Sequence, residues 1–125
     1  MKGAWRQNGV RSISPSDPCI AAHHTGIELL EIADGHVAAK LPDRSETTYH
    51  MGTQHAGALF TLAEAASGAA AVFLFADKVT TVKAAIVEAN ITYLRSARGE
   101  IIADGKLRQS GAEILSTFNA DGNVD

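Results

Sequence analysis

The chain has 125 residues, of which 46% are hydrophobic, and this length suits one modest core in a single domain spanning residues 1–125. The formal net charge is −3 and the basic residues form no cluster, which argues against a nucleic-acid partner. A single cysteine, Cys19, excludes a disulfide framework and a thiolate metal cluster. No apolar signal core opens the chain, so we expect a cytoplasmic protein.

The first third of the chain predicts an arm followed by a β-hairpin. Residues 1–20 are polar and contain two prolines, which favours an N-terminal arm or a short helix. Residues 26–32 nearly alternate in polarity, as a half-buried strand does, and Asp34-Gly35 is a strong hairpin signal. The returning strand is expected over residues 37–41, where Pro42 ends it.

Residues 47–76 contain one formally charged side chain, Glu64, in a run dominated by Ala, Leu, Phe, Val and Gly. We expect a central helix of about five or six turns, apolar on all sides because other elements surround it. A membrane span is the weaker interpretation, because Glu64 would lie in mid-bilayer and no basic flank is present. Removing an unpaired carboxylate from water is costly, so Glu64 is either catalytic or hydrogen-bonded within the core.

After the helix the pattern predicts strands over residues 80–94, 100–109 and 113–119, although no strand follows the last turn signal at Asp121-Gly122. An antiparallel sheet curled around one long helix is the α+β arrangement that satisfies these elements.

The start of the helix predicts an anion site. Residues 50–57 contain two glycines, and Thr53 is a plausible N-cap. The first free amides, around His55, Ala56 and Gly57, would bind an anion or a developing oxyanion. An ordinary capped helix start is the equally weighted alternative.

Spacing along the helix adds a constraint. Ala56 and Glu64 are eight residues apart, or about 12 Å along one helix, which is too far for both to touch one carbonyl. If they cooperate, they come from two copies of the chain related by a two-fold axis. One stripe of the helix carries small residues around Glu64 that would allow two helices to approach closely: Gly57, Thr61, Ser67 or Gly68, and Ala71.

Other chemistry is poorly supported. The pairs His23-His24 and His50/His55 do not form a recognised metal set, and the common phosphate-binding and nucleophile-elbow motifs are absent from the sequence. We therefore expect neither a metal nor another cofactor.

Three blocks of sequence together resemble the hot-dog-fold acyl-CoA thioesterases of the phenylacetate-degradation and 4-hydroxybenzoyl-CoA type. They are Gly52-Thr53-Gln54-His55-Ala56-Gly57-Ala58, Leu62-Ala63-Glu64-Ala65-Ala66 and Asn90-Ile91-Thr92-Tyr93-Leu94-Arg95-Ser96-Ala97. The resemblance covers roughly residues 25–120, and the family spacing of nine residues between the histidine and the acid is kept by His55 and Glu64.

This resemblance implies the hot-dog fold, in which five or six antiparallel strands wrap a central helix, and it implies homodimers or tetramers. It implies that Glu64 is the general base or nucleophile on a small-molecule thioester, that the Ala56 amide polarises the thioester carbonyl and that His55 braces the turn. Tyr49, His50 and Thr61 would then contact the substrate, with Tyr49 replacing an Asn or Gln that is frequent in the family.

Two other functions remain open on the same fold. The interval between His50 and Glu64 resembles that of hydroxyacyl-thioester dehydratases, although their Pro-Gly turn before the helix is absent. A non-catalytic acyl-thioester-binding protein is the second alternative, and Tyr49 in place of Asn favours it.

Overall fold

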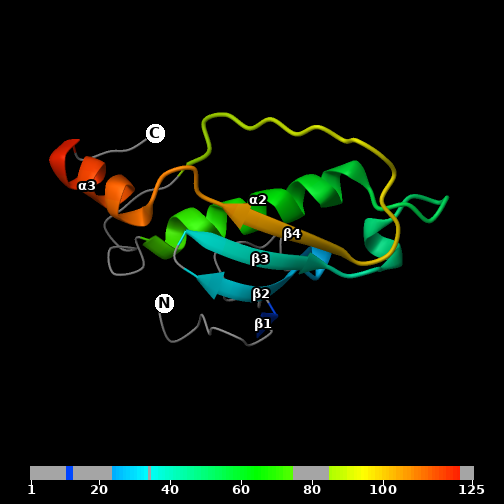
Figure 1. Ribbon diagram of the computed structural model, residues 1–125. Coiled ribbons are helices and arrows are strands. Elements are labelled where there is room, and N and C mark those ends of the chain that lie inside the picture. Colours follow the sequence, from blue (N-terminus) through cyan, green and yellow to red (C-terminus); the bar gives the residue numbers. More distant parts are fainter. Residues whose placement is uncertain (1–10, 13–23, 34, 75–84, 122–125) are drawn as a thin grey trace.

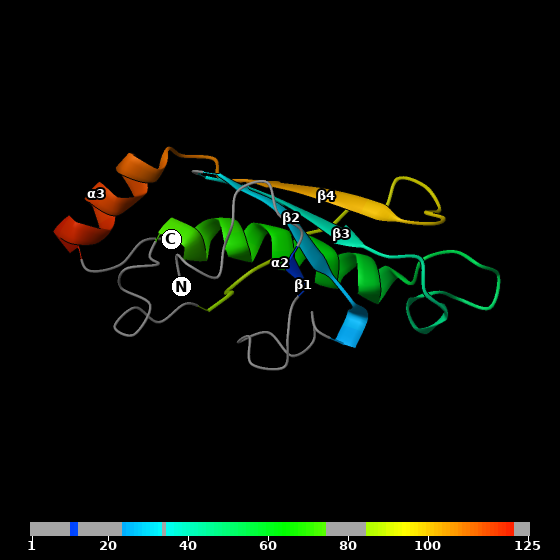
Figure 2. The same ribbon diagram turned by 90° about the horizontal axis from the view of Figure 1, so that it is seen from below.

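An antiparallel sheet and a long helix form two layers (Figures 1 and 2). The structure, a computed structural model, describes residues 11–12, 24–33, 35–74 and 85–121. In spatial order the strands are β1 (Arg11–Ser12), β2 (Glu28–Ala33), β3 (His36–Leu41) and β4 (Ile101–Lys106). The helices are α2 (Ala56–Leu74) and α3 (Gly111–Asp121), and a short 3-10 helix, η2 (Ser45–Thr47), precedes α2.

The predicted hairpin is confirmed as β2 and β3. Ala33 pairs with His36, and Gly35 adopts a φ of 70°, the left-handed conformation that a tight turn needs. Along β3, buried positions alternate with partly exposed ones, and Val37 and Leu41 are fully covered. The predicted strand over residues 100–109 is also confirmed, as β4, which pairs with β3 along its whole length.

The core lies between the sheet and one face of α2. Four residues at intervals of four form the buried stripe of the helix: Ala58, Leu62, Ala66 and Ala70. Because three of them are alanines, the helix backbone approaches the sheet closely. A Cβ added at Gly105 of β4 would stand 2.7 Å from the Ala66 carbonyl group, so this contact depends on glycine.

The opposite face of α2 is not covered by the sheet, which corrects the prediction of a helix surrounded on all sides. Gly57, Phe60 and Ser67 are exposed on that face. The described strands contact the helix only through its other face, so they cannot enclose it. By length and composition, residues 56–73 are apolar enough to span a membrane, but one such helix is weak evidence because core helices share this composition.

Residues 85–94 do not form the predicted strand, and residues 80–84 lie outside the described part of the chain. The segment is extended but makes no backbone hydrogen bond with the other described residues. It runs separately from β4 up to the turn that joins them (Figure 1). A β-strand forms only when a neighbouring strand pairs with its backbone hydrogen-bonding groups, so the β-prone sequence of this segment does not by itself make it a strand. Val87 and Leu94 are 95% and 88% exposed.

The strand predicted over residues 113–119 is wrong, because this segment belongs to helix α3. A capping box explains the difference: the Glu113 amide donates to the Ser110 hydroxyl, and the Ser110 amide donates to the Glu113 carboxylate. This local pair satisfies two amides that a helix start would otherwise leave free. The described sheet therefore has four strands rather than five or six.

The N-terminal arm lies largely outside the described residues. Its described part, Arg11–Ser12, forms β1 and pairs with Leu29 and Glu28 of β2. This short pairing was not predicted.

Candidate functional site

A tight loop delivers the chain to the start of α2. The Tyr49 amide donates to the Thr53 carbonyl over 2.8 Å, and the Gly52 amide donates to the Tyr49 carbonyl over 2.9 Å. Gly52 has a φ of 80°, which favours glycine. The loop therefore presents residues 49–52 at the same end of the molecule as the first turn of α2.

His55, rather than Thr53, caps the helix. The Gly57 amide donates to Nδ1 of His55 over 2.9 Å, while the His55 amide donates to the Thr47 carbonyl over 2.8 Å. Because Nδ1 accepts this bond, the proton of a neutral His55 ring resides on Nε2. Thr53 instead forms an isolated β-bridge with Arg98. The expectation that His55 braces this turn agrees with this geometry.

Of the three amides predicted to face an anion, only that of Ala56 has no hydrogen-bond partner among the described residues. The amides of His55 and Gly57 are both engaged. Gly57 is thus occupied in this conformation, and Ala56 is the donor that the geometry leaves available to a ligand.

Glu64 lies on the face of α2 that the described strands leave uncovered, which is called the uncovered face below. It is two residues from both Leu62 and Ala66. Two residues correspond to roughly 200° around the helix axis, so Glu64 lies on the side opposite the buried stripe. The side chain is half-buried rather than fully buried, and its carboxylate makes no hydrogen bond or ion pair with the described residues. Within one chain it does not meet Ala56.

The three residues predicted to contact the substrate differ in exposure and in hydrogen bonding. Tyr49 lies against His55, with ring centroids 4.5 Å apart, and its side chain is partly exposed. His50 is exposed in the loop. The Thr61 hydroxyl donates to the Gly57 carbonyl over 2.9 Å, so it is engaged by the helix itself. Tyr49 and His55 are brought together, whereas Thr61 lies a turn further along.

Gln54 is the residue whose role the sequence did not reveal. It is 3% exposed, and its side chain joins three segments. Its amide nitrogen donates to the carbonyls of Pro42 and Gly99, over 3.2 and 2.8 Å, and its amide oxygen accepts from the Thr47 hydroxyl over 3.0 Å. A polar residue beside the helix start was the only signal, and it could not indicate these partners.

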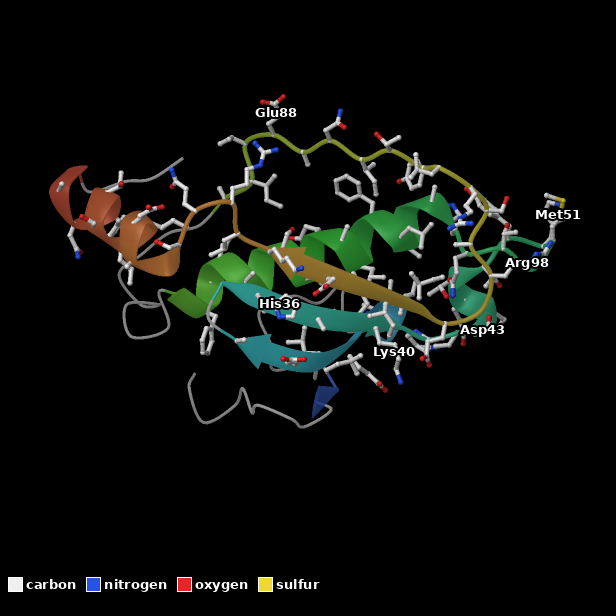
Figure 3. All side chains as sticks on the ribbon, in the orientation of Figure 1. His36, Lys40, Asp43, Met51, Glu88 and Arg98 are labelled. Atoms are coloured by element: carbon white, nitrogen blue, oxygen red, sulfur yellow. The ribbon has the colours of Figure 1, made fainter. Side chains whose placement is uncertain are left out.

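Arg98 closes the other side of the loop. Its guanidinium donates to the Met51 carbonyl over 3.2 Å. Figure 3 shows Met51 and Arg98 together at the end of the molecule where α2 begins. Among the described residues, no group of three or more His, Cys, Asp or Glu side chains could hold a metal ion.

Charged pairs cover the outer face of the sheet, away from the helix. The Lys40 ammonium lies 3.0 Å from the Glu28 carboxylate and 3.5 Å from that of Glu100, and the hydrogen bond that it donates to Glu28 is the main cause of its raised pKa. His36 of β3 is hydrogen-bonded to Asp104 of β4, and this hydrogen bond lowers the pKa of Asp104. These pairs stabilise the strand pairing and lie outside the candidate site.

Comparison with known proteins assigns the chain to a family. The model of a family described as "Domain of unknown function (DUF4442)" matches residues 22–125. The chain belongs to the DUF4442 family. A crystal structure from Pseudomonas aeruginosa, described as a protein of unknown function and probable thioesterase, has a TM-score of 0.62 and 25% identity with this DUF4442 chain. The match covers 83% of this chain and 68% of that one.

Two further relatives are similar to this DUF4442 protein. Zebra fish thioesterase superfamily member 2 has a TM-score of 0.58 at 23% identity, over 76% of this chain and 67% of that one, and shows the fold alone. A Halobacterium salinarum protein, whose name assigns esterase activity only provisionally, is 30% identical over 92 residues. That match covers 71% of this chain, which spans 60% of the relative's length. The family and these matches support the hot-dog thioesterase superfamily, as the sequence motifs predicted.

Proposed function

We propose that this DUF4442 protein is a thioesterase that hydrolyses an acyl-CoA or aryl-acyl-CoA. The observation that carries the proposal is the Ala56 amide, which stands at the start of a 19-residue helix without a partner among the described residues. Such an amide, with the positive end of the helix dipole behind it, suits the oxygen of a carbonyl that gains negative charge. The thioesterase and esterase names of the relatives support the same chemistry.

In the proposed reaction, the Ala56 amide donates to the thioester carbonyl oxygen. The Glu64 carboxylate accepts a proton from a water molecule, whose oxygen attacks the carbonyl carbon. The tetrahedral intermediate carries its charge on the oxygen that Ala56 holds. When it collapses, the carbon–sulfur bond breaks, the thiolate leaves, and the proton on Glu64 passes to the sulfur. Tyr49 and His50, exposed beside the helix start, are the proposed contacts for the rest of the substrate.

This mechanism needs a second copy of the chain. Glu64 and Ala56 are separated by about 12 Å along one helix, so we propose that the acid of one copy acts at the helix start of the other. The uncovered face of α2 carries Glu64 between small residues, which would allow two helices to approach.

Hydrolysis of a panel of acyl-CoA and aryl-acyl-CoA thioesters, with release of the free thiol as the readout, tests the proposal. We expect Glu64→Gln to lower kcat by about 100- to 10,000-fold, because it removes the general base while keeping the shape of the side chain. Glu113→Gln, on the distant helix α3, is the matched control.

Three results would contradict the proposal. Unchanged turnover in Glu64→Gln would remove this residue from the mechanism. Binding of a CoA ester without hydrolysis would indicate an acyl-thioester-binding protein. Hydration of an enoyl thioester that depends on His50 would indicate a dehydratase.

A further inference from the structure

One tyrosine joins the extended segment to the start of α2. The Tyr93 hydroxyl donates to the Ala56 carbonyl over 3.0 Å, a contact between residues 37 positions apart in the sequence. Residues 85–92 make no backbone hydrogen bond with the other described residues, so no such bond anchors the chain just before Tyr93. The contact therefore belongs to the helix start and to the turn that follows Tyr93.

The peptide group between Ala56 and Gly57 is held at both ends by side chains. Its N–H donates to Nδ1 of His55, and its carbonyl accepts from the hydroxyl of Tyr93. The first turn of a helix is otherwise the part that frays most easily, because its amides have no partners within the helix. Two side chains from different parts of the chain thus add to the helical bond from the Phe60 amide in holding the orientation of this peptide plane.

We infer that Tyr93 is a positioning residue for the oxyanion-binding amide of Ala56. This inference rests on the proposed function. The Ala56 amide and the Ala56 carbonyl flank the same Cα, so a bond that holds the carbonyl also restricts the direction in which the amide points. A donor that stabilises an oxyanion must keep its alignment through the reaction, and small displacements of such a donor cost rate. Tyr93 acts through this backbone and has no contact of its own with the reacting atoms.

The position of Tyr93 also explains why a segment with little other support matters for the site. Two further hydrogen bonds join the turn after Tyr93 to the loop before α2. The backbone N–H of Gln54 donates to the Ala97 carbonyl, and the Arg98 guanidinium donates to the Met51 carbonyl. These bonds hold the segment at its carboxyl end, so that the Tyr93 ring stands beside the helix start.

Tyr93→Phe tests the inference, because it removes the hydroxyl and keeps the ring. We expect kcat for an acyl-CoA to fall about three- to tenfold with KM unchanged, the loss expected when one neutral hydrogen bond in the transition state is weakened. The matched control is Thr92→Val, which removes a neighbouring hydroxyl that has no hydrogen bond within the described part of the chain. We expect kcat and KM of the control to stay within twofold of wild type.

A second readout is independent of turnover. The carbonyl carbon of Ala56 has a chemical shift that reports hydrogen bonding to its oxygen, and we expect Tyr93→Phe to move it upfield while Thr92→Val leaves it in place. The double variant Tyr93→Phe/His55→Ala should lose less activity than the product of the two single losses, because both side chains hold the same peptide group.

The outcomes separate the inference from the proposed function. An unmoved Ala56 carbonyl shift, or a moved shift with unchanged kcat, would overturn the positioning role. A rise in KM with kcat unchanged would overturn it as well, because that pattern indicates substrate binding. If the wild-type chain hydrolysed no thioester, the proposed function itself would fail, and with it the positioning role of Tyr93 in catalysis. The carbonyl shift would then still decide whether the contact exists.

Discussion

At the scale of single residues, the side-chain amide of Gln54 joins the end of β3, the η2 region and the turn before β4. All its polar atoms are paired, with Thr47, Pro42 and Gly99, and the residue is almost fully buried. Burying a paired amide costs little, but removing it leaves two partly buried carbonyls, those of Pro42 and Gly99, without this donor.

We predict that Gln54→Ala lowers the free energy of unfolding by about 1–3 kcal/mol, because the Pro42 and Gly99 carbonyls lose this donor and the Thr47 hydroxyl keeps only its bond to the Arg44 carbonyl. Urea denaturation followed by circular dichroism measures the change. Gln109→Ala is the control, since Gln109 is exposed and has no hydrogen bond to the described residues. Equal unfolding midpoints for the two variants would show that the Gln54 network contributes nothing to stability.

A second residue-scale prediction concerns acid stability. The hydrogen bond from His36, followed by smaller charge interactions with His36 and Lys106, holds the pKa of Asp104 below its ordinary value. A lowered folded-state pKa contributes stability above the unfolded pKa of about 3.9, and this stability is lost as the pH falls through the folded-state value. Asp104→Asn should therefore be less stable than wild type at pH 7, and the difference should shrink as the pH falls below about 4.

Thermal unfolding of both proteins from pH 7 down to pH 3 measures that difference. Asp43→Asn, which removes an exposed carboxylate with no ion pair among the described residues, controls for the loss of one negative charge. A difference between wild type and Asp104→Asn that stayed constant across this range would contradict the assignment.

At the scale of elements, the contact between β4 and α2 depends on a residue without a side chain. A Cβ at Gly105 would stand 2.7 Å from the Ala66 carbonyl carbon and oxygen and 3.0 Å from the Ser67 nitrogen. These are backbone atoms within a helix, and they cannot move aside as the end of a flexible side chain can. We predict that Gly105→Ala destabilises the protein by about 1–3 kcal/mol through overpacking.

The unfolding midpoint in urea tests this prediction, and Lys106→Ala provides a neighbouring substitution at a side chain that is 70% exposed. A Gly105→Ala protein as stable as wild type would mean that strand and helix separate easily at this point. Loss of stability in the lysine variant alone would place the sensitivity in the outer face of the sheet.

The elements also show what the sequence could predict. The hairpin and α2 follow from local signals: alternation, the Asp34-Gly35 turn and a long apolar run, each of which acts within a few residues. The extended state of residues 85–94 depends on whether a neighbouring strand is present, which no local pattern contains. Helix α3 also has a local signal, the Ser-x-x-Glu spacing of Ser110 and Glu113, which the strand predicted over residues 113–119 did not take into account.

The candidate site divides in the same way. His55, Ala56 and Glu64 could be selected from the sequence, because charge and helix-start chemistry are properties of residue types. The hydrogen bonds of the His55 and Gly57 amides were needed to choose among the three helix-start amides. The roles of Gln54 and Tyr93 depend on contacts with residues about 40 positions away in the sequence. Long-range partners depend on the packed structure.

At the scale of the whole molecule, each chain holds one half of two proposed sites. Its helix start offers the Ala56 amide, and the uncovered face of the same helix offers the Glu64 carboxylate. Two copies related by a two-fold axis would complete both sites at once, and neither site would be complete in a single chain.

Complementation between two inactive variants tests this arrangement. Ala56→Pro removes the amide hydrogen at the first position of α2, where proline is well tolerated, and should lower kcat about 100- to 1,000-fold. Glu64→Gln removes the acid. In a mixed dimer of the two variants one site carries both defects and the other carries neither, so an equal, re-equilibrated mixture should recover about a quarter of wild-type activity. Sites built within one chain would recover no activity on mixing, whatever the ratio of the two variants.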